Sequence, residues 1–409
     1  MRQRIDVHES KDRYDRAEQH VKVDKQLSNA NRENILRFVS DLQAEGIGQL
    51  RVIKYLCILP KLSKLLKKDF QKATINDIKR LVNEINQLPL SDWTKSDCRV
   101  TLKRFYRWLR KLPPGENAPE TAWIRIGNGN KRVLPEELLT EDEIQKLLDQ
   151  CANSRDRAFV LCTYETGGRI GELLSMRIKH VQFDSLGAHL MFSGKTGDRR
   201  VRVIPSAPAL SQWLLDHPGR ENPDSPLWIA IGDRNSGDPL LYFAARALLR
   251  RLAKRAGIKK KVNPHAFRHS RASFLANGRL NERQMEQYLG WTTGSKMPKI
   301  YVHLSGRDTD TAILRLNGLE EEPQKKRPQL TTVVCPRCQL KNESTLKFCG
   351  KCGLPLRLEV AMEVEDQRKQ ADDYMNRLLE DPEVRQLIQA KLRNWALQEA
   401  MKQVKAVQP

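Results

Sequence analysis

The sequence predicts a mainly α-helical protein with a small antiparallel β-sheet, an α+β fold divided into several domains. Apolar residues recur every three to four positions from residue 28 to residue 112, whereas stretches of alternating apolar and polar residues occur between about 179 and 204. Two charged, proline-bearing segments interrupt these patterns. A chain of 409 residues also exceeds the length that one hydrophobic core usually organises.

Residues 1–112 are expected to form a compact helical domain. A capping box at Thr74 opens one of its helices, with Asp77 in place of the usual glutamate or glutamine. The last helix, about 94–112, carries four cations at spacings of four, four and three, which places them on one stripe: Arg99, Lys103, Arg107 and Arg110. This stripe either follows DNA phosphates or is an ordinary solvated face, and the charge of the whole chain favours DNA.

The charge balance of the chain indicates a polyanionic partner. There are 72 basic and 50 acidic residues, which gives a net charge of +22 spread along the length. No run approaches the roughly 20 apolar residues of a membrane-spanning helix, so we expect double-stranded DNA as partner, with no membrane and no small-molecule substrate. The expected location is the cytoplasm, in association with the nucleoid.

A second domain is expected at residues 136–319, after a linker at 113–135 that begins with Pro113 and Pro114. A capping box at Thr140 opens its first helix. The pattern predicts helices at about 141–151, 154–166, 208–216, 238–256, 264–277 and 280–289, and strands near 179–183, 187–193 and 199–204. The strands are close enough in sequence to form one antiparallel sheet.

Three motifs of this domain carry residues that suit the cleavage of a phosphodiester without a metal. Such cleavage needs cations for the phosphate oxygens, a nucleophile, and an acid for the leaving oxygen, and arginine binds phosphate through two parallel hydrogen bonds. An arginine and a glutamate follow a double glycine, an HxxRH motif places its polar residues on one helical face, and a Leu-Gly-Trp motif precedes a tyrosine by a short segment. These residues are Arg169, Glu172, His265, Arg268, His269, Trp291 and Tyr301.

This ordered set resembles the tyrosine recombinase (phage integrase) family over about residues 140–316. The resemblance implies a DNA breaking-rejoining catalytic domain, preceded by a core-binding, SAM-like domain. It also implies a site-specific recombinase that integrates, excises or resolves DNA elements through a 3′-phosphotyrosyl intermediate. No ATP or cofactor is needed for that catalysis, and the family acts as a synaptic tetramer.

The resemblance assigns a role to each residue of the set. Arg169 and Arg268 would bind the scissile phosphate, and His265 and Trp291 would add hydrogen bonds, with Glu172 and His269 in support. Lys195, between two predicted strands, would protonate the leaving 5′ oxygen, or would be a solvent-facing turn lysine. Tyr301 would attack the phosphorus. Two departures are that Trp291 occupies a position where many members have histidine, and that Tyr301 lies ten residues after it, one more than usual. Tyr288 is the alternative nucleophile.

A four-cysteine pattern follows within residues 330–358. Two CxxC pairs, ten residues apart, resemble a zinc ribbon, because four thiolates satisfy tetrahedral zinc: Cys335, Cys338, Cys349 and Cys352. A redox dithiol is the competing interpretation of a single pair. A ribbon after the tyrosine resembles archaeal integrase-like proteins. Residues 359–409 are expected to form a helical tail that either docks on the body of the protein or contacts another protomer.

Two other functions fit parts of these observations. A non-catalytic DNA-binding regulator with a zinc ribbon explains the charge and the cysteines, but it leaves the order of the arginines, histidine and tyrosine unexplained. A type IB topoisomerase-like enzyme uses similar residues and would relax supercoils without a defined site. A metal-dependent nuclease is disfavoured, because no convincing cluster of carboxylates is found.

Overall fold

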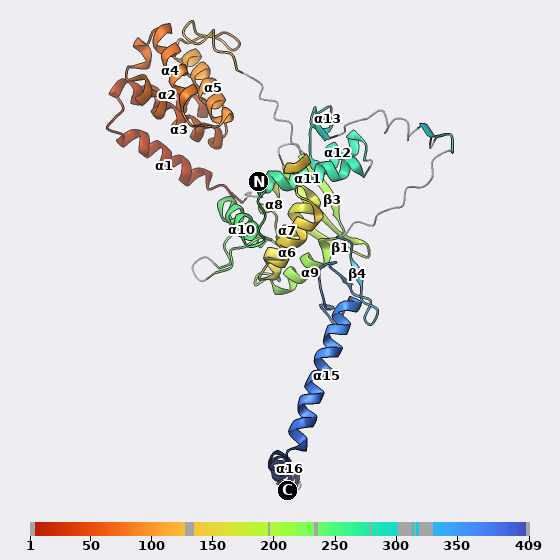
Figure 1. Ribbon diagram of the computed structural model, residues 1–409. Helices are drawn as coiled ribbons and strands as arrows, with labels where there is room; N and C mark the ends of the chain where they lie inside the picture. Colours follow the sequence, from red (N-terminus) through yellow and green to blue (C-terminus); the bar gives the residue numbers. More distant parts are fainter. Residues whose placement is uncertain are drawn as a thin grey trace.

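The chain is mainly helical, with a three-stranded and a two-stranded antiparallel sheet (Figure 1). The computed structural model describes residues 5–126, 135–194, 197–232, 236–278, 280–301, 313–314, 316–318 and 330–405. The predicted mainly helical α+β fold is therefore confirmed. Within these ranges no helix has both the length and the apolar character needed to cross a membrane.

The N-terminal domain is a group of five helices around an aromatic core. The helices are α1 (Ser10–Val23), α2 (Asn29–Ala44), α3 (Gln49–Leu66), α4 (Ile75–Gln87) and α5 (Asp92–Leu109). Phe105 lies at its centre, with its ring 5.2 Å from that of Phe38 and 4.9 Å from that of Phe70, and all three side chains are fully buried. The predicted capping box begins α4. The Thr74 hydroxyl accepts a hydrogen bond from the Asp77 backbone amide, and the Asp77 carboxylate accepts one from the Thr74 backbone amide. Helix entry is thus encoded locally.

Residues 113–126 have no regular secondary structure, but they pack on the N-terminal domain instead of forming the linker that the sequence suggested. Ala118 and Ile124 are buried in the core of the N-terminal domain. Arg110 holds this segment through an ion pair of 2.5 Å with the largely buried carboxylate of Glu120. The prolines end α5, but the chain then folds back on the same domain, so the expected linker 113–135 is shorter; residues 127–134 of it lie outside the described residues.

The central domain surrounds the larger sheet with helices. Its elements are α6 (Glu141–Asp149), α7 (Ser154–Thr166), α8 (Ile170–Leu174), β1 (Val181–Asp184), β2 (Gly187–Gly194), β3 (Gly197–Val203), α9 (Ala207–Asp216), α10 (Tyr242–Arg255), α11 (Pro264–Asn277), α12 (Glu282–Leu289) and α13 (Pro298–Tyr301). The expected end of this domain at residue 319, and the second charged segment after it, lie largely outside the described residues.

The sheet of the central domain has the order β1-β2-β3, and each neighbouring pair is antiparallel. Alternate residues of β2 and β3 face the core, so Leu190, Phe192, Val201 and Val203 are buried. Helix α7 is buried along most of its length, which is typical of a central core helix that is not amphipathic. The sheet and α7 therefore form the rigid base on which the polar residues of this domain lie.

The first described residues belong to the central domain rather than to the N-terminal one. Val7 is 4% exposed within the core of the central domain, and its carbonyl accepts a hydrogen bond of 2.9 Å from the Tyr242 backbone amide. The His8 ring lies 4.9 Å from that of Tyr242. The Asp6 carboxylate then accepts from the backbone amide of Ser10, the first residue of α1. The chain therefore crosses between the two domains at both ends of the N-terminal helices.

Replacing Val7 by alanine should lower the free energy of unfolding of the central domain by about 2 kcal/mol. The change removes two methyl groups from a closed core, at about 0.8 kcal/mol each plus the cost of the space left behind. Urea unfolding of the full chain measures this difference. Val23→Ala is the matched control, because Val23 is 59% exposed and should change stability by less than about 0.5 kcal/mol. Equal effects of the two variants would contradict the assignment of Val7 to the core.

The C-terminal part consists of a small module and two long helices. Strands β4 (Val333–Val334) and β5 (Lys341–Asn342) pair within the module, and α15 (Leu358–Glu380) and α16 (Pro382–Lys405) follow. Figure 1 shows α15 extending away from the body, with α16 beyond its far end. Every residue from 362 to 380 is exposed, so α15 does not dock on the body of the protein over this length.

Candidate active site and metal centre

The first arginine of the motif set lies at a tight turn between α7 and α8. Gly167 ends α7 with a φ of +53°, in the left-handed region that favours glycine. A Cβ atom at Gly168 would lie 2.8 Å from the ring of Phe192 on β2. The two glycines therefore let the chain reverse against the sheet and deliver Arg169 as the residue immediately before α8.

Glu172 links this arginine to a second one on the sheet. Its carboxylate is 4% exposed, and it accepts from Arg169 Nη1 at 3.0 Å and from Arg199 Nη2 at 2.7 Å. Burial alone would raise the pKa of Glu172, but the hydrogen bonds and charges of Arg199 and Arg169 hold the pKa below its usual value. The carboxylate is thus ionised and balances two neighbouring guanidinium groups.

Arg268 on α11 joins the turn after α7 to the end of α12. Its Nη1 donates to the Gly167 carbonyl at 2.8 Å, and its Nη2 donates to the Leu289 carbonyl at 2.9 Å. Burial, together with the charges of Arg169 and Arg199, lowers the pKa of Arg268 to about 10. Three guanidinium groups therefore share one region with a single buried carboxylate, an arrangement that suits an additional anion such as a phosphate.

Tyr301 lies beside this cationic region in contact with two residues of the motif set. Its ring stacks on that of Trp291, with centroids 5.8 Å apart and planes 9° apart. Its hydroxyl is hydrogen-bonded with Nδ1 of His269. Burial raises the pKa of Tyr301 to about 12, although the charge of Arg268 acts in the opposite direction. The phenol is therefore protonated at neutral pH.

The remaining predicted residues of the set differ in what the structure describes. His265 is exposed as a whole residue. The part of its ring that is shielded from solvent lowers its pKa, and the positive charge of Arg268 acts in the same direction. Lys195 lies outside the described residues. Its neighbour Gly194 approaches Glu172 so closely that a Cβ atom there would lie 2.2 Å from a carboxylate oxygen. The end of β2 therefore reaches the buried carboxylate of the site.

The site contains an arginine that the motif search did not single out. The side chain of Arg199 is 8% exposed, and its Nε donates to the Tyr288 carbonyl at 3.2 Å in addition to its contact with Glu172. A signal was present in the sequence, because Arg199 occupies the same strand face as the buried Val201 and Val203. Tyr288, the alternative nucleophile, is partly buried, and its hydroxyl donates to backbone carbonyls of Glu165 and Arg202.

The stripe of cations on α5 is partly committed to contacts within the N-terminal domain. Lys103 Nζ donates to the Ile124 carbonyl at 3.2 Å, and Arg110 pairs with Glu120. The Arg99 guanidinium donates to the side-chain oxygen of Asn86. Part of the predicted stripe therefore holds residues 113–126 in place. This structural role is separate from any contact that the stripe makes with DNA phosphates.

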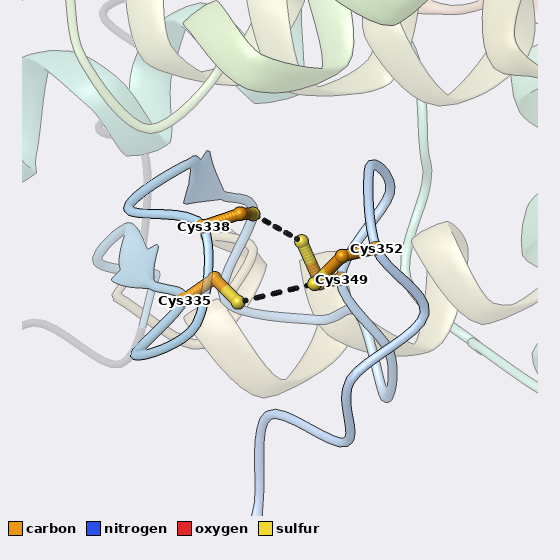
Figure 2. A group of neighbouring side chains, drawn as sticks. All are labelled: Cys335, Cys338, Cys349 and Cys352. Carbon is orange, nitrogen blue, oxygen red and sulfur yellow. Dashed lines mark hydrogen bonds between the residues drawn. The ribbon is translucent and has the colours of Figure 1, made fainter.

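Four thiols converge in the C-terminal module (Figure 2). The Sγ atoms of Cys335 and Cys352 lie 3.6 Å apart, those of Cys338 and Cys349 lie 3.5 Å apart, and all four lie within 4.8 Å of one another. Tetrahedral zinc with Zn–S bonds of about 2.3 Å requires sulfurs about 3.8 Å apart. The donor set is therefore compatible with a structural zinc ion that fills all four positions.

The cysteine module contacts the central domain through a buried charge. Glu343 is 2% exposed, and its carboxylate accepts from Arg157 Nε on α7 at 2.8 Å. The Arg157 guanidinium also donates to the hydroxyl of Thr345, and Lys341 Nζ donates to the carbonyl of Ser185. The module is thus fixed to the domain that carries the candidate active site.

Comparison with known proteins identifies relatives of the central domain. Residues 137–307 match the phage integrase family. Tyrosine recombinase XerA of Pyrococcus furiosus is 31% identical over 46% of this chain. The matched part spans 64% of the length of that relative. Tyrosine recombinase XerD of Chlorobaculum tepidum is 28% identical, over 57% of this chain and 78% of that protein. A crystal structure of XerH site-specific recombinase bound to a palindromic difH substrate, in a post-cleavage complex, is similar with a TM-score of 0.53 and 18% identity. The superposition covers 78% of this chain and 98% of the XerH chain, and the likeness concerns the fold.

Proposed function

We propose that the chain, whose residues 137–307 match the phage integrase family, is a site-specific DNA recombinase. It cuts and rejoins DNA through a 3′-phosphotyrosyl intermediate. The observation that carries the proposal is the convergence of Arg169, Arg268, Trp291 and Tyr301 on one cationic region. Arg169 lies 99 positions before Arg268 in the sequence, so their proximity requires an explanation beyond local packing.

In the proposed reaction the two arginines bind the non-bridging oxygens of the scissile phosphate. The transition state carries more negative charge on these oxygens than the ground state, so fixed guanidinium groups stabilise it preferentially. Tyr301 Oη forms a bond to phosphorus while the bond from phosphorus to the 5′ oxygen breaks. Lys195 supplies the proton to that leaving oxygen, and His265 and Trp291 add hydrogen bonds to the phosphate.

Rejoining reverses the same steps with the 5′-hydroxyl of another strand as nucleophile. The phosphotyrosyl ester conserves the energy of the broken bond, so neither ATP nor a catalytic cofactor is needed. The partner is double-stranded DNA, bound by several copies of the chain that assemble as a tetramer for strand exchange. The enzyme would act in the cytoplasm, at the nucleoid, where its DNA is. The net charge of +22 supports this partner.

A structural zinc ion completes the proposal for the cysteine module. Cys335, Cys338, Cys349 and Cys352 would hold it as thiolates, and the close approach of their sulfurs supports this assignment. The ion would keep the two loops of the module together. Glu343 could then maintain its contact with Arg157, which fixes the module to the catalytic domain.

Covalent trapping tests the proposed reaction. The wild-type chain is incubated with nicked DNA substrates from its genomic neighbourhood, denatured, and examined for protein-bound DNA. We expect an adduct that Tyr301→Phe abolishes, because the phenylalanine has no nucleophilic oxygen. Tyr288→Phe is the matched control and should retain the adduct, since the Tyr288 hydroxyl is already bonded to the backbone carbonyls of Glu165 and Arg202.

Two results would favour the competing functions. No adduct with any substrate, while DNA binding stays intact, would indicate the non-catalytic regulator. An adduct on any sequence, together with relaxation of supercoiled DNA, would indicate the topoisomerase-like enzyme. Retention of the adduct by Tyr301→Phe and its loss in Tyr288→Phe would move the nucleophile to Tyr288.

A further inference from the structure

The hydrogen bond between His269 and Tyr301 points to a direct part for this histidine in strand cleavage. We propose that Nδ1 of His269 accepts the phenol proton of Tyr301 as Tyr301 Oη attacks the phosphorus. The inference rests on the proposed function, and it gives His269 a chemical step in place of the supporting part implied by the resemblance. His265, which belongs to the same motif, is left to bind the phosphate.

The geometry distinguishes the two histidines of α11. Residues 265, 268 and 269 lie on one helical face, but the described hydrogen bonds connect Tyr301 with His269 and not with His265. The ring of Tyr301 is held by stacking on Trp291, which is 8% exposed. The direction of the phenol oxygen towards Nδ1 is therefore set by packing as well as by the hydrogen bond itself.

The protonation states also suit a transfer from Tyr301 to His269. Burial lowers the pKa of His269, and the charges of His265 and Arg268 lower it further, while Glu137 acts in the opposite direction. The imidazole is thus neutral at neutral pH, and Nδ1 can accept a proton when Nε2 carries the ring hydrogen. Because burial raises the pKa of Tyr301 to about 12, the phenol needs such an acceptor.

The proton balance of the step is complete. Tyr301 Oη loses its proton to Nδ1 and forms the bond to phosphorus, and the leaving 5′ oxygen takes a different proton from Lys195. The positive charge that develops on His269 is repelled by Arg268, but it lies beside a phosphate whose negative charge increases in the transition state. In the rejoining reaction His269 returns the proton to the phenol, as microscopic reversibility requires.

Single-turnover cleavage of two substrates tests the inference. One is the ordinary nicked DNA, and the other carries sulfur in place of the scissile 5′ oxygen, so that its leaving group needs no proton. His269→Asn places an amide oxygen near the position of Nδ1 and can accept the phenol hydrogen bond, but it cannot take up a proton. We expect it to cleave both substrates about 10²- to 10⁴-fold more slowly than the wild type. Lys195→Ala should be slow on the oxygen substrate and recover on the sulfur one.

The dependence of the rate on pH separates proton transfer from a structural role. The wild-type rate should fall as the pH drops through the pKa of His269, which lies below 6.5, because a protonated imidazole accepts nothing. His269→Asn should lack this fall, whereas His265→Asn on the same helix face should keep it. His269→Ala should recover activity when imidazole is added. A misfolded variant would show none of these patterns.

Three results would overturn the inference. His269→Asn could cleave the ordinary substrate within threefold of the wild-type rate, or could be rescued by the sulfur substrate, which would make His269 the acid. The low-pH fall could instead disappear in His265→Asn, which would assign the step to His265. These results leave the adduct of the wild type intact, so they are distinct from a failure of the proposed function, in which the wild type forms no adduct with either substrate.

Discussion

Replacement of Glu172 by glutamine should lower the free energy of unfolding of the central domain by about 3–5 kcal/mol. This is the typical cost of removing one partner from a buried ion pair, because the remaining charge is left without compensation. Glu172 is 4% exposed and pairs with Arg199, whose side chain is 8% exposed, and with Arg169. The same change should slow strand cleavage about a hundredfold or more, since an unbalanced Arg169 is no longer held in position for phosphate.

The pH dependence of stability provides an independent test of this carboxylate. The pKa of Glu172 is below its ordinary value of 4.5 in the folded chain. The folded state therefore binds this proton less readily than the unfolded state, so the stabilisation is present above pH 4.5 and is lost as the pH falls through the lowered pKa. Urea unfolding at a series of pH values should show this loss for the wild type and not for Glu172→Gln.

A double-mutant cycle with Arg199 isolates the buried pair. Arg199→Met removes the second charge, and we expect the double variant to be more stable than the sum of the two single effects predicts. Glu116→Gln is the matched control, because Glu116 is exposed and should change stability by less than about 0.5 kcal/mol. Additive effects of the Glu172 and Arg199 changes would show that the two residues do not stabilise each other.

Features encoded by neighbouring residues were predictable from the sequence. The capping boxes at Thr74 and Thr140 depend on residues three positions apart, and both are present. The strands around the predicted hairpin also appear, because alternation of apolar and polar residues is a local pattern. The two CxxC pairs are also a local pattern, and the structure brings their four sulfurs together.

Contacts between distant residues could not be predicted from such patterns. The burial of Val7 in the central domain depends on Tyr242, and the folding back of residues 113–126 depends on a pair between Arg110 and Glu120. Residues 113–126 lack the apolar periodicity of a regular element and were expected to be part of a linker, whereas Val7 was assigned with residues 1–112 to the N-terminal domain. Their positions follow from single buried side chains and single hydrogen bonds, which leave little trace in composition.

The candidate site lies between these two cases. The order of the motifs indicated which residues belong together, because the resemblance to a known family carries their three-dimensional arrangement. It could not show that Arg199 completes the cluster, or that His269 rather than His265 meets the tyrosine. The two histidines lie one helical turn apart on the same face, so spacing alone does not distinguish them.

Replacement of Cys349 by serine should abolish zinc binding and unfold the cysteine module while the central domain stays folded. The apparent free energy of zinc binding by structural sites of this kind is about 10–16 kcal/mol, and it is largely the folding energy of the module. Two short strands and a few buried residues cannot replace it. We expect the zinc content to fall from one ion per chain to nearly none, and proteases to cut readily after residue 330. Cys57→Ser, at an exposed cysteine outside the module, should keep the ion.

The contact between Glu343 and Arg157 makes the effect of zinc extend beyond the module. Arg157 lies on α7, the central helix of the central domain, and it loses its partner Glu343 when the module unfolds. The melting temperature of the central domain should therefore fall as well. Glu343→Gln separates the two effects, because it should retain the ion and still lower the melting temperature. If Cys349→Ser kept a full complement of zinc, the four-thiolate site would be wrong. If the zinc-free chain melted like the wild type, the ribbon would be an independent appendage, and its function would have to be sought in contacts with DNA or another protein.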